Sequence, residues 1–358
     1  MISLDFWKNK RILITGHTGF KGSWLSIWLK TMGAEITGYA LEPYTDRDNF
    51  VVTDLQNSID HVIGDVRDFE NLSGIFREYN PEFVFHLAAQ PLVRESYLNP
   101  KETYDINIGG TVNVLECCRM TDSVKVIVNI TTDKCYENNE RIWGYKENDR
   151  LGGYDPYSSS KACSEIVTEA CRSSFFHPEE FEKHGKSLAS ARAGNVIGGG
   201  DWQTDRLIPD CIRALEIDDS VVVRNPSAIR PWQHVLEPLS GYLFLAKEMF
   251  ENPGRFCEAW NFGPEEESTK PVGKVVDLVV KCWGKGSRQD RPDKNAPHEA
   301  NVLKLDITKA KTLLGWAPAW NIEQSIKATV DWYKSYQMDN MYQFCCQQIE
   351  SYMDNISR

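Results

Sequence analysis

Residues 11–31 read RILITGHTGFKGSWLSIWLKT, and this segment is the strongest local evidence for the fold class. Its first five residues form an apolar run typical of a buried strand, and an amphipathic helical pattern begins at Ser23. Between the two lie Gly16, Gly19 and Gly22. Glycines at a strand-to-helix turn allow a tight bend, close approach of the backbone to a pyrophosphate, and close packing of helix on strand. The segment therefore predicts a dinucleotide-binding turn, with a purely structural turn as the alternative.

The same rhythm of strand and helix continues to about residue 192. Short apolar runs occupy residues 11–15, 35–40, 61–65, 82–89, 124–130 and 187–192, separated by helical patterns. Continuous apolar runs suit strands that are covered on both faces. We therefore expect an α/β fold with a Rossmann-like, doubly wound parallel sheet.

Beyond Asn195 this rhythm breaks into Gly- and Pro-containing loops between short elements. We expect residues 1–194 to form the nucleotide-binding domain. Residues 195–358 should form mainly a smaller substrate-binding lobe, interleaved with the first domain, and some segments should return to that domain.

Composition excludes several classes of protein. The 358 residues include 41% hydrophobic residues, enough for a large core, and carry a net charge of −11. An acidic chain is a poor candidate for binding nucleic acid or an anionic membrane. No window approaches the ~18 apolar residues of a membrane span, and Asp5 interrupts any signal-peptide core. The ten cysteines lack metal-ligand spacing, so we expect no metal site and reduced thiols in a cytoplasmic protein.

A proton-transfer pair is predicted in the segment DPYSSSK, residues 155–161. Asp155 can cap a helix whose first residue is Pro156. Tyr157 and Lys161 then lie at i and i+4 on one helix face. A lysine cation favours the phenolate and is expected to lower the pKa of the tyrosine toward neutrality. A surface pair of no catalytic role is the alternative.

The segment ITTDKCY, residues 130–136, follows another predicted strand. Thr132 is a hydroxyl residue, and Asp133 and Lys134 add one acid and one candidate base next to the tyrosine site. An elimination needs such a pair, because one group must remove a carbon-bound proton while another protonates the departing hydroxide. A surface salt bridge between Asp133 and Lys134 is the alternative.

Together these motifs resemble the extended short-chain dehydrogenase/reductase superfamily, and within it the CDP-glucose 4,6-dehydratase subgroup. The segments that carry the resemblance follow one another along nearly the whole chain: GHTGFKGSW, FHLAAQPLVR, NITTDKCYEN, GGYDPYSSSK, RAGNVIGGGDW, IRPWQHVLEPLSGYL, WNFGP, PHEANVLKLD and LGWAP. Members of this superfamily self-associate, so a homodimer or homotetramer is implied. Relatives commonly supply dideoxyhexoses for bacterial surface polysaccharide such as lipopolysaccharide O-antigen.

The resemblance implies NAD as the cofactor and a set of residues that hold it. This set comprises Gly16, His17, Thr18, Gly19, Phe20, Lys21, Gly22, Asp65, Val66, Leu87, Ala88, Ala89, Gln90, Asn107, Tyr157 and Lys161. One position departs from the family pattern. Ala40 stands where an acidic residue usually binds the adenine ribose. Glu42 follows two residues later, and it either binds the ribose or is an exposed loop carboxylate. The nearest arginine that could favour NADP is Arg47.

The resemblance also implies a nucleotide-sugar substrate, CDP-glucose. The residues expected to bind it are Gln90, Asn195, Arg206, Arg224, Arg230 and His298. Guanidinium groups bind phosphate oxygens in bidentate fashion, which would account for arginines in an acidic chain. Arg206 and Arg224 have ordinary surface arginines as their alternative.

The reaction implied is a hydro-lyase reaction on C4, C5 and C6 of the sugar. Tyr157 would take the C4 hydroxyl proton during hydride transfer, and Thr132 would bind the C4 oxygen. Lys134 would remove the C5 proton and Asp133 would protonate the hydroxyl leaving C6, before hydride returns to C6. Two alternatives stay open: another nucleotide-sugar dehydratase or 4-epimerase of the superfamily, and a catalytically idle NAD-binding regulator.

Overall fold

The computed structural model describes residues 5–292 and 301–356. Within them, a central sheet of seven parallel strands has the order β11-β6-β5-β4-β1-β2-β3. The strands are β1 (Arg11–Thr15), β2 (Glu35–Ala40), β3 (Asp60–Ile63), β4 (Phe83–His86), β5 (Val126–Ile130), β6 (Ser187–Arg192) and β11 (Ala259–Asn261). The six predicted strands and the doubly wound parallel sheet are thus confirmed. The seventh strand is too short to stand out as an apolar run.

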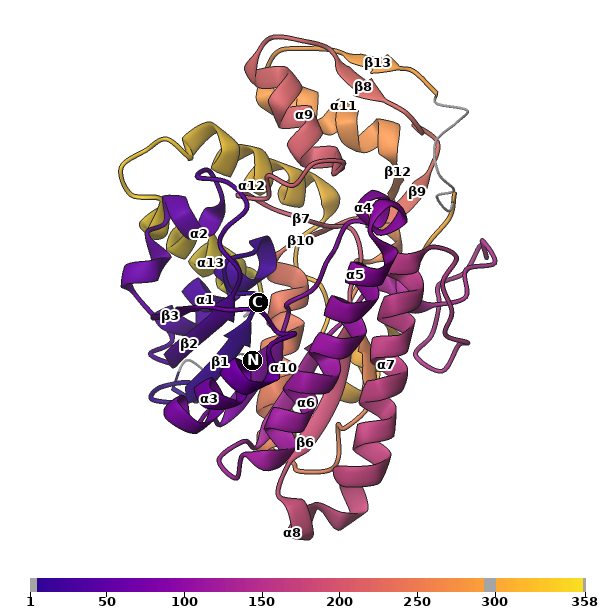
Figure 1. Cartoon of the computed structure of the whole chain (residues 1–358). Helices are drawn as coiled ribbons and strands as arrows, with labels where there is room; N and C mark the ends of the chain where they lie inside the picture. Colours follow the sequence, from indigo (N-terminus) through magenta and orange to yellow (C-terminus); the bar gives the residue numbers. More distant parts are fainter. Residues whose placement is uncertain (1–4, 293–300, 357–358) are drawn as a thin grey trace.

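Helices cover both faces of this sheet (Figure 1). One face packs against α1 (Phe20–Thr31), α10 (Leu236–Glu251) and α13 (Met341–Ile356). The other packs against α3 (Phe69–Tyr79), α6 (Gly110–Met120) and α7 (Pro156–Phe175). Along β1, Ile12 and Ile14 face the first core and Leu13 faces the second, because successive side chains of a strand alternate. This double burial explains why the strands read as continuous apolar runs.

A second lobe lies at the carboxyl end of the sheet, at the top of Figure 1. Its helices are α9 (Leu207–Glu216) and α11 (Val272–Trp283), and α12 (Ile322–Ser335) packs against α11. Its short strands form three pairs: β7 (Val196–Ile197) with β10 (Gln233–His234), β8 (Val221–Val223) with β13 (Arg288–Asp290), and β9 (Ile229–Pro231) with β12 (Thr269–Pro271).

The chain after residue 194 both builds this lobe and returns to the sheet, through α10 and β11. The boundary at residue 194 stays a prediction. The remaining α-helices of the described residues are α2 (Asn49–Val52), α4 (Val93–Leu98), α5 (Pro100–Tyr104) and α8 (Phe181–His184).

Three further observations concern the cysteines, metal sites and membrane-spanning helices. All ten cysteines are free thiols, buried or half-buried. The described residues contain no cluster of three or more His, Cys, Asp or Glu side chains arranged to hold a metal ion. In the same part of the chain, no helix has the length and apolar character needed to cross a membrane.

Candidate active site

A cavity of about 980 Å³ lies where the carboxyl ends of the sheet strands meet the second lobe. Its wall includes residues that directly follow β1, β4, β5 and β6, together with residues of α9 and β8. In open parallel sheets, ligands bind at this edge. The volume lies at the upper end of the range for ligand sites, roughly 300–1,000 Å³, which suits a large ligand or two ligands side by side.

The glycine turn forms one end of the cavity. Gly16 has a φ of +79°, and a Cβ on it would lie 2.7 Å from the backbone nitrogen of Ala88. Helix α1 starts directly after Gly19, whose lack of a side chain leaves the first N–H groups uncapped. The first turn, Phe20–Gly22, contains no acidic residue. These uncapped N–H groups and the positive end of the helix dipole fit a pyrophosphate, as the sequence predicts.

His17 is the exception within this turn. Its ring is fully buried against Gly38, where a Cβ would lie 2.2 Å from His17 Cγ, and its Nε2 lies 2.6 Å from Nδ1 of His61. Burial lowers the pKa of His17 to about 3, so the ring is neutral. The side chain packs between strand and turn instead of lining the cavity. A cofactor contact by His17 would therefore involve its backbone, and it stays a prediction.

The wall beyond the turn carries the residues expected at the adenosine end. Asp65, Val66 and Glu42 all line the cavity. Arg67 donates to both carboxylate oxygens of Asp65 and holds the pKa of this carboxyl group below its usual range. Ala40 ends β2, which leaves Glu42 as the first carboxylate after the strand.

Arg47 makes its contacts outside the cavity. Its guanidinium stacks 3.5 Å from the ring centroid of Trp202 and donates to Glu216 and to the hydroxyl of Tyr336. These contacts tie the loop after β2 to the second lobe. Arg47 is also missing from the cavity wall formed by the described residues.

Gln90 and Asn107 support the cavity from behind rather than line it. The amide of Asn107 accepts from the backbone nitrogen of Gln90 at 2.8 Å and donates to its carbonyl at 3.0 Å. The Gln90 side chain folds back onto the backbone of Leu92 and onto Thr103. Asn107 sits on a wide helical turn, residues 105–109, between α5 and α6. Both residues thus shape the loop after β4, and direct ligand contacts by their side chains stay a prediction.

Tyr157 and Lys161 lie in the first turns of α7, on its buried face, as predicted. Asp155 caps the helix by accepting from the backbone nitrogen of Ser158 at 2.8 Å. Tyr157 lines the cavity, whereas Lys161 donates to the carbonyl of Ile130 at 3.4 Å.

The expected direction of the Tyr157 pKa is wrong for the protein by itself. Burial raises the pKa of Tyr157 to about 12, opposed by a hydrogen bond with Thr132. Burial also lowers the pKa of Lys161 to about 8, against the nearby charge of Glu165. Desolvation of each group outweighs the attraction that the i, i+4 spacing predicts.

Thr132, Asp133 and Lys134 occupy the wall at the end of β5, beside Tyr157. The Thr132 hydroxyl donates to Asp133 Oδ1 at 3.0 Å. Asp133 is 1% exposed and packs against Gly194, where a Cβ would collide with the carboxylate. Burial raises its pKa, and its Oδ2 has no hydrogen-bond partner within residues 5–292 and 301–356. Lys134 is half-buried at the same wall.

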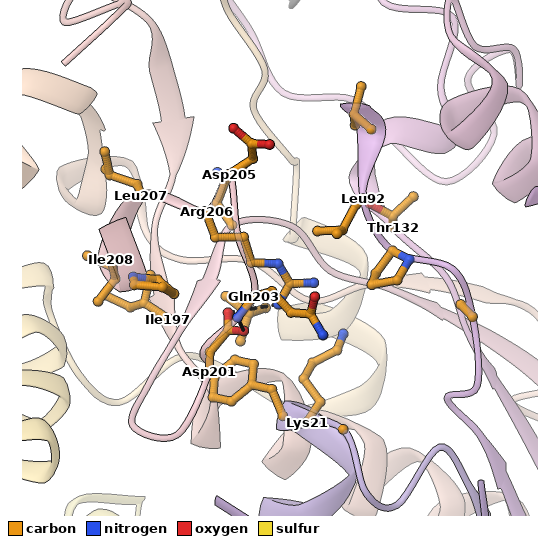
Figure 2. Close-up of a pocket in the computed structure, with 18 of the residues that line it drawn as sticks. Lys21, Leu92, Thr132, Ile197, Asp201, Gln203, Asp205, Arg206, Leu207 and Ile208 are labelled. Atoms are coloured by element: carbon orange, nitrogen blue, oxygen red, sulfur yellow. Dashed lines mark hydrogen bonds and ion pairs between the residues drawn. The ribbon is translucent and has the colours of Figure 1, made fainter. Parts of the chain in front are cut away.

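The opposite wall is basic. Asn195, Arg206, Arg224 and Arg230 all line the cavity, and their binding of a substrate stays a prediction. Arg206 forms a 2.7 Å ion pair with the buried Asp201, and Figure 2 shows both side chains beside Gln203. His298 lies outside the described residues.

Sequence reasoning missed several residues of this wall: Arg94, Asp201, Gln203 and Asp205. Lys21, which the sequence assigns to the cofactor, also lines the cavity. Figure 2 shows Lys21 reaching from α1 toward Gln203 and Arg206. Burial, followed by the charges of Lys161 and Arg206, lowers the pKa of Lys21 to about 7. Arg94 could have been identified from the sequence, because it ends the segment FHLAAQPLVR, which follows β4 and carries part of the family resemblance. The other three lie in an irregular loop, where no periodicity points inward.

The family profile described as GDP-mannose 4,6-dehydratase matches residues 13–329. The chain belongs to the GDP-mannose 4,6-dehydratase family. This family match covers the glycine turn, the Thr132–Lys134 segment, α7 and the arginine wall.

Curated relatives narrow the position within the family. The CDP-glucose 4,6-dehydratase of Salmonella typhimurium is 50% identical over the full length of both chains. The dTDP-glucose 4,6-dehydratase of Xanthomonas campestris pv. campestris is 26% identical over 91% of this chain and 93% of its own.

Solved structures agree on the fold. The dTDP-glucose 4,6-dehydratase from Streptomyces venezuelae, with NAD bound, has a TM-score of 0.77 at 22% identity, covering 91% of this chain and 97% of its own. The dTDP-glucose 4,6-dehydratase from Bacillus anthracis, in complex with NAD, has a TM-score of 0.75 at 22% identity, covering 92% and 97%.

Proposed function

We propose that this chain is a CDP-glucose 4,6-dehydratase, a hydro-lyase that converts CDP-D-glucose to CDP-4-keto-6-deoxy-D-glucose and water. The observation that carries the proposal is the position of Tyr157, Thr132, Asp133 and Lys134 on one wall of a cavity that begins at the glycine turn. An epimerase needs the tyrosine and a hydroxyl residue but has no use for an acid and a base at the end of β5. The full-length identity of 50% to the Salmonella enzyme supports cytosine as the base.

The cofactor is proposed to be NAD, which supplies the hydride acceptor and donor of the reaction when bound. The uncapped start of α1 and the close approach of Gly16 to Ala88 fit its pyrophosphate. Asp65 and Val66 would hold the adenine. The engagement of Arg47 by Trp202, Glu216 and Tyr336 leaves it poorly placed for a 2′-phosphate, which favours NAD over NADP.

The first step assigned to the protein is removal of the C4 hydroxyl proton by Tyr157. Thr132 would donate to or accept from the C4 oxygen and keep it near the phenol. Because the pKa of Tyr157 is about 12 in the protein alone, with Lys161 in place, the phenolate needs positive charge brought by the bound ligands. Lys161 would orient the ribose of the cofactor.

The elimination is assigned to the Asp-Lys pair. Lys134, when neutral, would remove the C5 proton, which the neighbouring 4-ketone makes acidic. Asp133 would protonate the hydroxyl that leaves C6. Its burial, its raised pKa and the unpartnered Oδ2 within the described residues support a carboxyl group that can hold a proton to donate.

We further propose a homodimer or homotetramer in the cytoplasm. Leu98, Val112 and Ile166 expose large apolar side chains on α4, α6 and α7, along one side of the sheet domain. An exposed apolar helix face of this kind suits self-association. The ten free thiols suit a reducing compartment.

The test is incubation of the purified protein with NAD⁺ and CDP-glucose, with formation of the 4-keto sugar followed by its alkaline absorbance. Parallel reactions contain dTDP-glucose, UDP-glucose and GDP-mannose. Product from CDP-glucose alone is the expected result. Product from another nucleotide sugar would overturn the base assignment, and NAD binding without any keto product would favour an epimerase or a regulator.

A further inference from the structure

One carboxylate on the cavity wall is shared by two arginines from different lobes. Asp205 Oδ1 lies 3.3 Å from Nη1 of Arg94 and 3.1 Å from Nη2 of Arg224. Arg94 belongs to α4, beside the sheet domain, and Arg224 follows β8 in the second lobe. All three residues line the cavity. Asp205 therefore bridges the two lobes through the guanidinium groups on either side of it.

A neighbouring pair shows why this bridge is of a different kind. Asp201 and Arg206 form a 2.7 Å ion pair in which the carboxylate is 7% exposed. The side chains of Asp205, Arg94 and Arg224 are 39%, 37% and 40% exposed. Figure 2 shows the Asp205 carboxylate directed away from the Arg206 side chain that follows it in the chain. Water reaches the Asp205 carboxylate and its two arginines. These ions therefore separate more readily than the Asp201–Arg206 pair, whose carboxylate is buried.

The backbone conformation of Asp205 is that of a turn. Its φ is +58°, in the left-handed region. Aspartate adopts this conformation more readily than most residues, although less readily than glycine. The residue lies in the loop between β7 and α9 that forms part of the wall. The left-handed conformation is compatible with a carboxylate that lies on the cavity wall beside two guanidinium groups.

We propose that Arg94 and Arg224 form a clamp across the two lobes for the diphosphate of the nucleotide sugar, and that Asp205 is the internal anion that competes for it. The inference rests on the proposed function, because it assigns part of that function's substrate site. A diphosphate offers several anionic oxygens in the geometry that guanidinium groups bind best. It therefore displaces the single carboxylate oxygen that the two arginines share, and binding draws α4 and the β8 strand end onto one ligand.

The test is titration calorimetry with CDP and with cytidine, on the wild-type protein and on two variants. Arg94→Gln should weaken CDP binding about tenfold, the lower limit for loss of a charge-assisted hydrogen bond. Asp205→Asn should tighten CDP binding about two- to fivefold, since a half-exposed ion pair no longer has to be broken. Cytidine, which lacks phosphate, should bind both variants as it binds the wild type.

The control is Arg119→Gln, which breaks an exposed ion pair with Glu116 on α6, away from the cavity. It should leave the binding of CDP unchanged. Arg94→Lys keeps the charge but loses the planar fork, and should fall between wild type and Arg94→Gln. Unfolding midpoints of all variants check that each is folded.

Two results would overturn the inference while leaving the proposed function in place. One is wild-type CDP affinity in both Arg94→Gln and Asp205→Asn, in a protein that still forms the keto sugar. The other is an equal change for cytidine and CDP, which would indicate a general disturbance of the site. If the wild-type protein binds none of CDP, UDP, dTDP and GDP, the proposed function itself fails, and the inference fails with it.

Discussion

The phenol of Tyr157 and the ammonium group of Lys161 lie one helical turn apart, and burial moves their pKa values in opposite directions. The pKa of Tyr157 rises to about 12 and that of Lys161 falls to about 8. Residue types and spacing predict which groups are adjacent. They do not predict how much water each group loses, and at this site desolvation is the larger effect.

Replacing Tyr157 tests the first proton transfer. Tyr157→Phe removes the phenolic hydroxyl and keeps the ring and its packing. The kcat for formation of the 4-keto product should therefore fall by a factor of about 10²–10⁴, the usual contribution of a general base. Tyr154→Phe is the matched control, because Tyr154 is 77% exposed and lies just before the helix. A Tyr157→Phe enzyme with more than a tenth of wild-type kcat would contradict the assigned role.

Replacing Lys134 separates elimination from oxidation. Lys134→Ala should lower two rates by about 10²-fold or more: the exchange of the C5 proton with solvent deuterium and the formation of the 6-deoxy product. Mass spectrometry of the recovered nucleotide sugar measures both. Lys146→Ala, at an exposed lysine, is the control. Full turnover by Lys134→Ala would assign the base to another group.

Among the secondary-structure elements, α7 couples stability to catalysis. Its N-cap, Asp155, accepts from the backbone nitrogen of Ser158 at 2.8 Å and from the Ser158 hydroxyl at 2.7 Å. Tyr157 lies in the same first turn. Further along the helix, Ser160 and Ser164 bond to Asn107, Thr111 and Asn129. The buried face of α7 is thus held largely by polar contacts, which a hydrophobicity pattern does not predict.

Removing the cap should loosen the catalytic turn. Asp155→Ala should cost about 1 kcal/mol of unfolding free energy, the typical value of an N-cap, measured by urea denaturation. Because Tyr157 lies in the frayed turn, kcat should fall as well. Asp155→Asn retains an acceptor oxygen and should recover most of both. If Asp155→Ala matched the wild type in stability, the cap would have no energetic role.

Across the whole molecule, a buried carboxyl group joins the C-terminal helix to the core. Glu237 of α10 accepts from the backbone nitrogens of Ala319 and Trp320 and from the hydroxyl of Tyr352 on α13. Burial raises the pKa of Glu237 to about 7, although these hydrogen bonds oppose the shift. Tyr352 also packs its ring against Trp28 of α1, so the contact connects three helices.

This group makes stability depend on pH. Its pKa is higher in the folded state than the model-peptide value of about 4.3, so the stabilisation is complete below that value and is lost as pH rises through about 7. From pH 4.5 to pH 7.5 the contribution should fall by up to about 3 kcal/mol.

Urea denaturation across this range measures the effect. Glu237→Gln cannot ionise and should flatten the slope. Asp331→Asn, at a residue in an exposed pair on α12, is the control and should retain the slope. A wild-type slope that persists in Glu237→Gln would assign the pH dependence to other groups.

The sequence by itself determined the parallel sheet, the glycine turn, the cap of α7 and the Thr132–Lys134 segment, because each depends on residues close together in the chain. Local periodicity and turn chemistry are legible without knowledge of the partners. Only the tertiary structure shows that the His17 side chain packs between β2 and the glycine turn and that Arg47 stacks on Trp202. It also shows that Arg94 and Arg224 contact the same carboxylate, that of Asp205. These positions depend on contacts between segments that are distant in the sequence and on the loss of water at buried groups. Neither can be predicted from the spacing of residues along the chain.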